Sequence, residues 1–208
     1  MQHILESKHP SLYWYTPKDS MDYFFGKYYQ KIKDSMTEDQ FGWQVVAPLL
    51  NKIKCGHTSY VPSKKNIKYN NGSFKAFPLG LKFYKDSMIV WGSFINNDSV
   101  FNKGTVIQSI DGLKADELKN VLFDCISMDG YETNLAYTLL SNEFGYFYRS
   151  ITGLKDSFNI SYIDSTGSTT STFIHAVDFA DKGGKKSKDK QNARERKNEK
   201  IDEYRTLN

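Results

Sequence analysis

The sequence predicts an α+β protein, in which an N-terminal helical hairpin or small bundle precedes a sheet with its own helices. Three observations lead to this class. Apolar residues before residue 54 recur every three or four positions, and those after residue 76 alternate in short runs separated by turn signals. Aromatic residues make up 15% of the chain. Because each buries about 150–250 Å² of surface, a chain with this composition can form a core.

The first helix is predicted to begin at Thr16-Pro17, a hydroxyl cap followed by proline at the first helical position. Its apolar stripe follows at helical spacing: Met21, Phe25, Tyr28 and Ile32.

A second helix is predicted after Thr37, which forms a capping box with Gln40. Pro48 should kink or divide this helix, because proline cannot donate a backbone hydrogen bond. Its apolar stripe is wide: Phe41, Trp43, Val45, Val46, Leu49, Leu50 and Ile53. Two helices with such faces are expected to pack against each other.

The segment 60–75 is polar and is predicted to be a loop, with Asn70-Asn71-Gly72 as a turn. We place a domain boundary here, which gives an N-terminal helical domain over residues 1–62 and a second domain over 74–180. Residues 181–208 are expected to form a charged tail, either helical or disordered.

The second domain is predicted to contain strands, two helices and a closing hairpin. Asp111-Gly112 is a tight-turn signal, because glycine accepts a positive φ at little cost. The predicted strands are Phe77–Tyr84, Met88–Trp91, Gly104–Ile110, Phe158–Ile163 and Thr170–Ile174, and the predicted helices span Leu118–Cys125 and Tyr131–Phe144.

The positive charge of the chain is concentrated in its tail. The segment Lys182–Arg205 carries ten Lys or Arg and five Asp or Glu, a net +5, so that the rest of the chain carries −1 of the total +4. Because nucleic-acid binding requires basic residues on the folded surface, we expect no nucleic-acid partner. The tail is interpreted as a solvated linker or helix.

Cys55 and Cys125 form neither a CxxC pair nor a zinc-finger spacing, so the sequence predicts no metal site. Either the two thiols are free and partly buried, or they form one disulfide. No apolar run reaches the roughly 20 residues of a membrane span. The residues after Met1 do not resemble a secretory signal, so either the protein is cytoplasmic or a leader is missing.

Three features together resemble serine peptidases of the C-terminal-processing and tricorn-core family. The first is Cys55-Gly56-His57-Thr58 after a helical segment, and the second is Lys103–Gly112, similar to a strand and turn of bacterial PDZ-like domains. The third is the order of a helical domain, a PDZ-like domain and a charged connector. The resemblance covers about the whole chain and implies a PDZ-like, partly open β-barrel in the second domain.

By this resemblance, the chain is the N-terminal and PDZ-like part of a serine endopeptidase, and the nucleophilic serine lies in a missing C-terminal domain. His57 would then be the general base, because an imidazole titrates near neutrality. The family also contains a serine–lysine branch, in which His57 has no catalytic part. In some relatives a polar residue stands at Gly56 and assists the histidine. The alternative role of His57 is capping the preceding helix.

The resemblance implies unfolded polypeptides or protein C-termini as substrates, no cofactor, and a location in the periplasm or cell envelope. This chain alone shows no nucleophile in a competent setting. The second functional hypothesis is therefore a stand-alone, non-enzymatic peptide-binding module that acts by strand addition.

Overall fold

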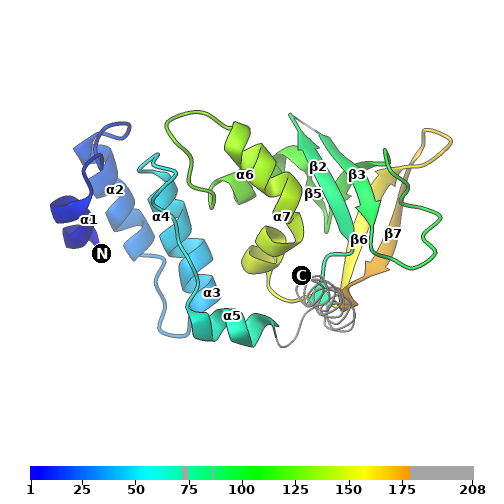
Figure 1. Cartoon of the computed structure of the whole chain (residues 1–208), viewed down its shortest axis with the longest axis horizontal. Coiled ribbons are helices and arrows are strands. Elements are labelled where there is room, and N and C mark those ends of the chain that lie inside the picture. Colours follow the sequence, from blue (N-terminus) through cyan, green and yellow to red (C-terminus); the bar gives the residue numbers. More distant parts are fainter. Residues whose placement is uncertain (72–74, 86, 179–208) are drawn as a thin grey trace, which may run out of the picture.

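The computed structural model describes residues 1–71, 75–85 and 87–178, and its α+β class is the one predicted. Helices come first and a mostly antiparallel sheet follows, with two more helices between its strands (Figure 1). The N-terminal elements are α1 (Gln2–Lys8), α2 (Lys18–Tyr29), α3 (Glu38–Phe41), the π-helical turn η1 (Gly42–Val46), α4 (Ala47–Asn51) and α5 (Lys64–Asn71).

Helix α2 starts where predicted, but the predicted cap is wrong. Pro17 is the N-cap residue, and no side chain caps the helix. The Thr16 hydroxyl instead donates to the carbonyl oxygen of Lys52 at 2.5 Å, which ties the start of α2 to the end of α4. The predicted stripe is buried at Met21, Phe25 and Tyr28.

The second predicted helix is present and is divided, as expected from Pro48. The capping box of Thr37 and Gln40 is confirmed, with both reciprocal hydrogen bonds in place. Pro48 lies in the first turn of α4, where its missing N–H is tolerated, and η1 directly precedes that turn.

The loop predicted for residues 60–75 is wrong over α5. Asn66 N–H donates to the Ser63 hydroxyl at the start of α5, and the amides of Asn66 and Asn70 donate to Asp39 at 2.6 and 2.9 Å. These bonds to α3 stabilise a polar helix that has no apolar stripe of its own. The rest of the predicted turn lies outside the described residues.

The sheet contains the strands that the sequence predicts. Its strand order is β2-β3-β4-β6-β7, with β5 beside β4, and β1 and β8 form a separate pair. The strands are β1 (Lys75–Ala76), β2 (Leu79–Tyr84), β3 (Ser87–Ser93), β4 (Val106–Ile110), β5 (Leu113–Lys114), β6 (Ser157–Ile163), β7 (Thr169–His175) and β8 (Val177–Asp178). The sheet is open, so the PDZ-like barrel is not confirmed and stays a prediction.

The turn predicted at Asp111-Gly112 is confirmed. Asp111 and Gly112 have φ of 50° and 84° and connect β4 to β5 in register Ile110↔Leu113. The Asp111 carboxylate accepts hydrogen bonds from the Tyr148 hydroxyl, the Lys155 ammonium and Asn159 N–H at 2.6, 2.7 and 2.8 Å. The turn is therefore anchored to the end of α7 and to β6.

Helices α6 (Ala115–Phe123) and α7 (Asn134–Thr152) pack on one face of the sheet. Helix α7 continues beyond the predicted end at Phe144, and Glu143 interrupts it with non-helical φ and ψ of −129° and 27°. The core between α7 and the sheet is rich in aromatic rings, among them Phe77, Phe83, Phe144, Phe147, Tyr148 and Phe158. Their edge-to-face and stacked contacts add to the stabilisation from burial.

The described residues form two apolar clusters. One belongs to the N-terminal helices and comprises Leu12, Met21, Phe25, Tyr28, Val45, Leu49, Leu50 and Ile53. The other fills the space between the sheet, α6 and α7, and also takes in Trp43 and Ala47 from the helical part. Tyr60 packs against both clusters. The domain boundary near residues 62–74 stays a prediction, and the tail 181–208 lies outside the described residues.

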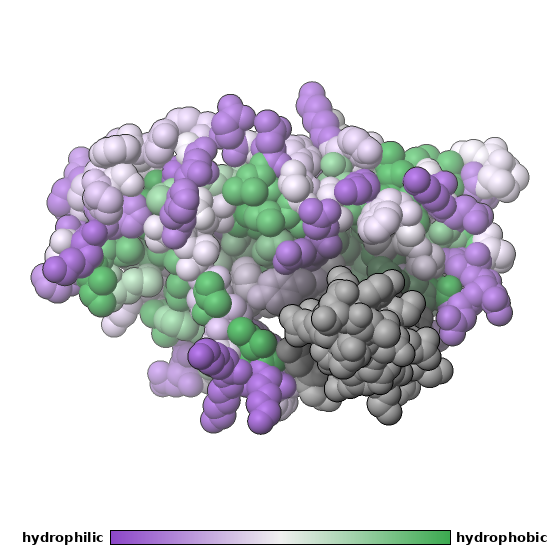
Figure 2. Space-filling view, in the orientation of Figure 1, coloured by the Kyte–Doolittle hydropathy of each residue, from purple (hydrophilic) through white to green (hydrophobic). Residues whose placement is uncertain are grey.

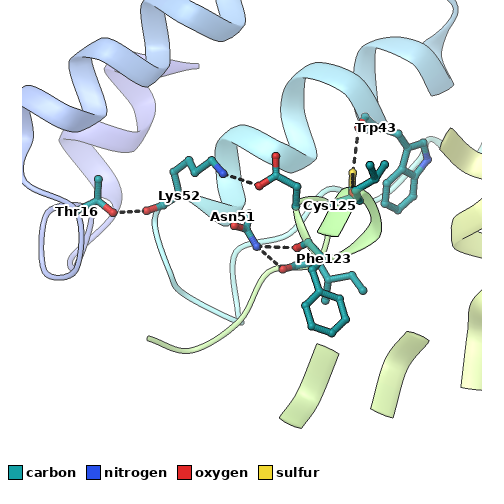
Figure 3. A network of polar contacts seen from close by, with 9 residues as sticks. Thr16, Trp43, Asn51, Lys52, Phe123 and Cys125 are labelled. Atoms are coloured by element: carbon teal, nitrogen blue, oxygen red, sulfur yellow. Dashed lines mark hydrogen bonds and ion pairs between the residues drawn. The ribbon is translucent and has the colours of Figure 1, made fainter. Parts of the chain in front are cut away.

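A polar network joins the helical part to the end of α6 (Figure 3). The Asn51 side-chain nitrogen donates to the carbonyl oxygens of both Phe123 and Ile126, and Asn51 is only 3% exposed. Beside it, Lys52 pairs with Asp124 at 2.5 Å. These contacts fix the segment that follows α4 against the segment that follows α6.

Hydrophilic side chains cover much of the face seen in Figure 2. Hydrophobic side chains gather near the centre of this face, over α6. Within the described ranges, no helix combines the length and apolar character that a membrane crossing requires.

Candidate functional site

The predicted base, His57, lies in a loop after α4 and is exposed to solvent. Helix α4 ends at Asn51 with Lys52 as its C-cap, so capping by His57 is not what the structure shows. Lys54 adopts φ of 60° and redirects the chain, and Thr58 N–H donates to the Cys55 carbonyl oxygen at 3.1 Å. His57 thus sits at the tip of a tight turn.

This turn is held in place by side chains from distant segments. The Thr58 hydroxyl bonds to His9 Nε2 at 2.9 Å, and the Ser127 hydroxyl donates to the Thr58 carbonyl oxygen at 2.7 Å. Gly130 N–H donates to the Lys54 carbonyl oxygen at 3.0 Å. The loop between α6 and α7 and the extreme N-terminal segment therefore position the His57 turn together.

Asp129 is the acidic partner that the sequence analysis missed. Its Oδ1 accepts a hydrogen bond from Gly56 N–H at 2.6 Å. The ligand atoms of Cys55, His57 and Asp129 lie within 4.8 Å of one another. Because Asp129 is far from His57 in the sequence, no spacing motif could have identified it.

An imidazole with a carboxylate beside it has the chemistry of a general base and its orienting group. The carboxylate stabilises the imidazolium that forms when the base accepts a proton. His57 and Asp129 are both exposed, so a nucleophile or a metal ion can approach them from solvent.

The two cysteines are free thiols. Cys125 is buried, and its Sγ donates to the Trp43 carbonyl oxygen at 3.3 Å. Burial, and secondarily the charge of Asp124, raises the pKa of Cys125 to about 12, so this thiol stays protonated and unreactive. Cys55 is half-buried and lies in the His57 turn.

A second candidate site lies along β2, at one edge of the sheet beside α7. A cavity of about 260 Å³ opens there, and its lining is mainly apolar: Phe77, Leu79, Leu81, Trp91, Phe94, Phe144 and Tyr146. An ideal Cβ at Gly80 would lie 2.6 Å from Trp91 Nε1, so only glycine leaves room for this indole across the strand. Helix α7 is interrupted at Glu143, within the lining of the cavity.

The backbone of β2 faces this groove. Phe83 N–H points towards α7 and donates to the Ser141 hydroxyl at 3.0 Å. Since alternate residues of a strand direct their N–H and C=O groups to the same side, Leu81 presents its backbone groups towards the same edge. An extended peptide can pair with such an edge and place side chains in the adjoining pocket.

No family model matches the chain, and no curated protein matches it. The chain is similar to CPAF in two crystal structures. A point mutant of CPAF aligns with a TM-score of 0.48 at 13% identity over 85% of this chain, and mature CPAF with 0.42 at 12% over 84%. The chain spans about a third of the CPAF length, at 32% coverage in both cases. Since both TM-scores are below 0.5, neither structure assigns an activity to this chain.

Proposed function

We propose that the chain is the substrate-binding and base-bearing part of a serine endopeptidase, and that the nucleophilic serine comes from a further domain. The observation that carries this proposal is the exposed His57 beside Asp129 in a turn held by His9, Ser127 and Gly130. A base that serves a nucleophile on another domain must be accessible and must be fixed in position. Both requirements agree with the contacts of this turn.

In the proposed reaction, His57 takes the proton of the serine hydroxyl as the serine attacks the peptide carbonyl. It then gives this proton to the departing amine, so the base is regenerated. Asp129 orients the ring and stabilises its protonated form. The serine–histidine mechanism is therefore favoured over the serine–lysine mechanism in this proposal.

The test is turnover of an unfolded polypeptide by the full-length protein that contains this chain. His57→Gln should lower kcat about 10²–10⁴-fold and leave KM nearly unchanged, because general base catalysis contributes that factor. His175→Gln is the matched control, because His175 is also exposed but lies at the end of β7. Equal kcat values for the two variants would remove the base assignment.

The groove along β2 favours a second function, which is peptide binding by strand addition without turnover. Trp91 lines the groove and is 51% exposed, so it offers an aromatic anchor for a bound side chain. We expect peptides with a free C-terminus to bind to the 208-residue chain, and we expect N-methylation of alternate peptide nitrogens to abolish the binding.

The variant Trp91→Ala should weaken this binding about tenfold or more, as loss of an aromatic anchor does. Phe173→Ala is its matched control, because Phe173 is an exposed aromatic on β7, the opposite edge of the sheet. Titration of a labelled peptide library by fluorescence anisotropy measures both. If Phe173→Ala weakens binding as much as Trp91→Ala, the peptide does not occupy the β2 groove.

A further inference from the structure

The structure brings together three side chains of different chemistry that could all bind one metal ion. The Cys55 thiol, the His57 ring nitrogens and the Asp129 carboxylate have ligand atoms within 4.8 Å of one another. His57 and Asp129 are exposed and Cys55 is half-buried, so an ion can reach the cluster from solvent. We propose that Cys55, His57 and Asp129 form a Zn²⁺ site whose fourth position is open to water.

The donor set selects the ion. Thiolate and imidazole are soft or borderline ligands that favour Zn²⁺, whereas Ca²⁺ and Mg²⁺ require oxygen donors. Three protein ligands leave one tetrahedral position for water or another small ligand. Cys125 is not among these ligands, and its buried thiol donates to the Trp43 carbonyl oxygen instead.

The backbone already holds the ligands near the required geometry. Donor atoms bound to one tetrahedral Zn²⁺ at about 2.0–2.3 Å lie roughly 3.3–3.8 Å apart. Small side-chain rotations therefore close the cluster from its present spread of up to 4.8 Å. Lys54 at φ of 60° and the Gly130 N–H bond to its carbonyl oxygen fix the two loops relative to each other.

Gly56 has a specific part in this site. Its N–H donates to Asp129 Oδ1 at 2.6 Å and thereby orients the carboxylate, as outer-sphere hydrogen bonds do at metal centres. The second oxygen, Oδ2, remains for the ion. An ideal Cβ at Gly56 would lie only 3.0 Å from Oδ2, so the missing side chain lets the carboxylate approach.

Zn²⁺ binding changes the protonation of the ligands. Cys55 binds Zn²⁺ as thiolate and His57 binds it as neutral imidazole, so Zn²⁺ binding displaces any protons that these ligands hold and releases them to the buffer. A His57 ring that gives its lone pair to the ion cannot accept a proton from a serine. Zn²⁺ occupancy would therefore inhibit the endopeptidase, and this consequence alone rests on the proposed function.

Cobalt substitution tests the site on the 208-residue chain. We expect Co²⁺ to give a near-ultraviolet sulfur-to-cobalt charge-transfer band, and we expect Zn²⁺ to displace Co²⁺ and remove the band. Cys55→Ser should abolish the band, whereas His57→Gln and Asp129→Asn should each weaken binding at least about tenfold. Cys125→Ser and His175→Gln are the controls and should bind Co²⁺ like the unchanged chain.

A band that survives Cys55→Ser, or binding that is unaffected by both His57→Gln and Asp129→Asn, would overturn the site. Gly56→Ala offers a variant that removes no ligand, and it should also weaken binding, because its methyl group displaces Asp129. Calorimetry in two buffers of different ionisation enthalpy should report proton release on Zn²⁺ binding, and Cys55→Ser should reduce it. None of these readouts needs turnover, so failure of the metal site and failure of the peptidase proposal are distinguishable.

Discussion

Replacing Asn51 with alanine should destabilise the protein more than any other single change in the polar network that joins the helical part to the end of α6. The amide nitrogen of Asn51 satisfies the carbonyl oxygens of Phe123 and Ile126, and the side chain is almost completely buried (Figure 3). Each buried acceptor left without a partner costs about 1–3 kcal/mol. Because two acceptors lose their partner, we expect Asn51→Ala to lower the free energy of unfolding by about 2–6 kcal/mol.

The matched control is Lys52→Ala, which removes the neighbouring ion pair with Asp124. The side chains of Lys52 and Asp124 are 21% and 45% exposed, and an ion pair open to solvent contributes only about 0.2–1 kcal/mol. Urea unfolding of the 208-residue chain, followed by circular dichroism, measures both changes. If both variants lose the same free energy of unfolding, the claim that Asn51 is the main stabilising residue of this network is wrong.

Two further predictions concern titration and thiol reactivity. Burial alone would raise the pKa of Asp111, but hydrogen bonds from Lys155, Tyr148 and Asn159 outweigh it and hold the pKa below its ordinary value. The stabilisation is therefore fully present above the unfolded-state pKa of about 3.9 and is lost as the pH falls through the folded-state pKa. Asp111→Asn, which keeps a residue tolerant of positive φ, should flatten the decline in unfolding free energy as the pH falls below about 4 in urea titrations. An unchanged decline would contradict this prediction. In a native thiol titration with a disulfide reagent, Cys55 should react and Cys125 should react only after unfolding. Rapid labelling of a Cys55→Ser variant under native conditions would contradict the burial of Cys125.

The sequence was sufficient where the signal is local. The capping box at Thr37, the interruption at Pro48 and the turn at Asp111-Gly112 each depend on a few neighbouring residues, and each is present in the structure. Five strands were predicted for the same reason, because alternation of buried and exposed residues is a property of a single strand.

Features that depend on distant contacts were missed. Helix α5 has few apolar residues and depends on Asp39 of α3, so its own sequence resembles a loop. Thr16 is a residue type that commonly caps helices, yet its hydroxyl donates to the carbonyl oxygen of Lys52 instead. Asp129 lies near His57 because the fold places the segment after α6 beside the segment after α4, where Asn51 bonds to Phe123 and Ile126. The spacing of residues along the chain does not predict this tertiary contact.

The decisive measurement is labelling of the native protein, captured from its own cells with antibodies to residues 1–178, by a fluorophosphonate that reacts with activated serines. We predict a labelled band well above the 24.0 kDa of this chain, large enough for a further domain of roughly 150–250 residues. Introduction of His57→Gln should remove the label. An unlabelled band at 24.0 kDa would contradict the peptidase proposal and leave peptide binding along β2 as the function.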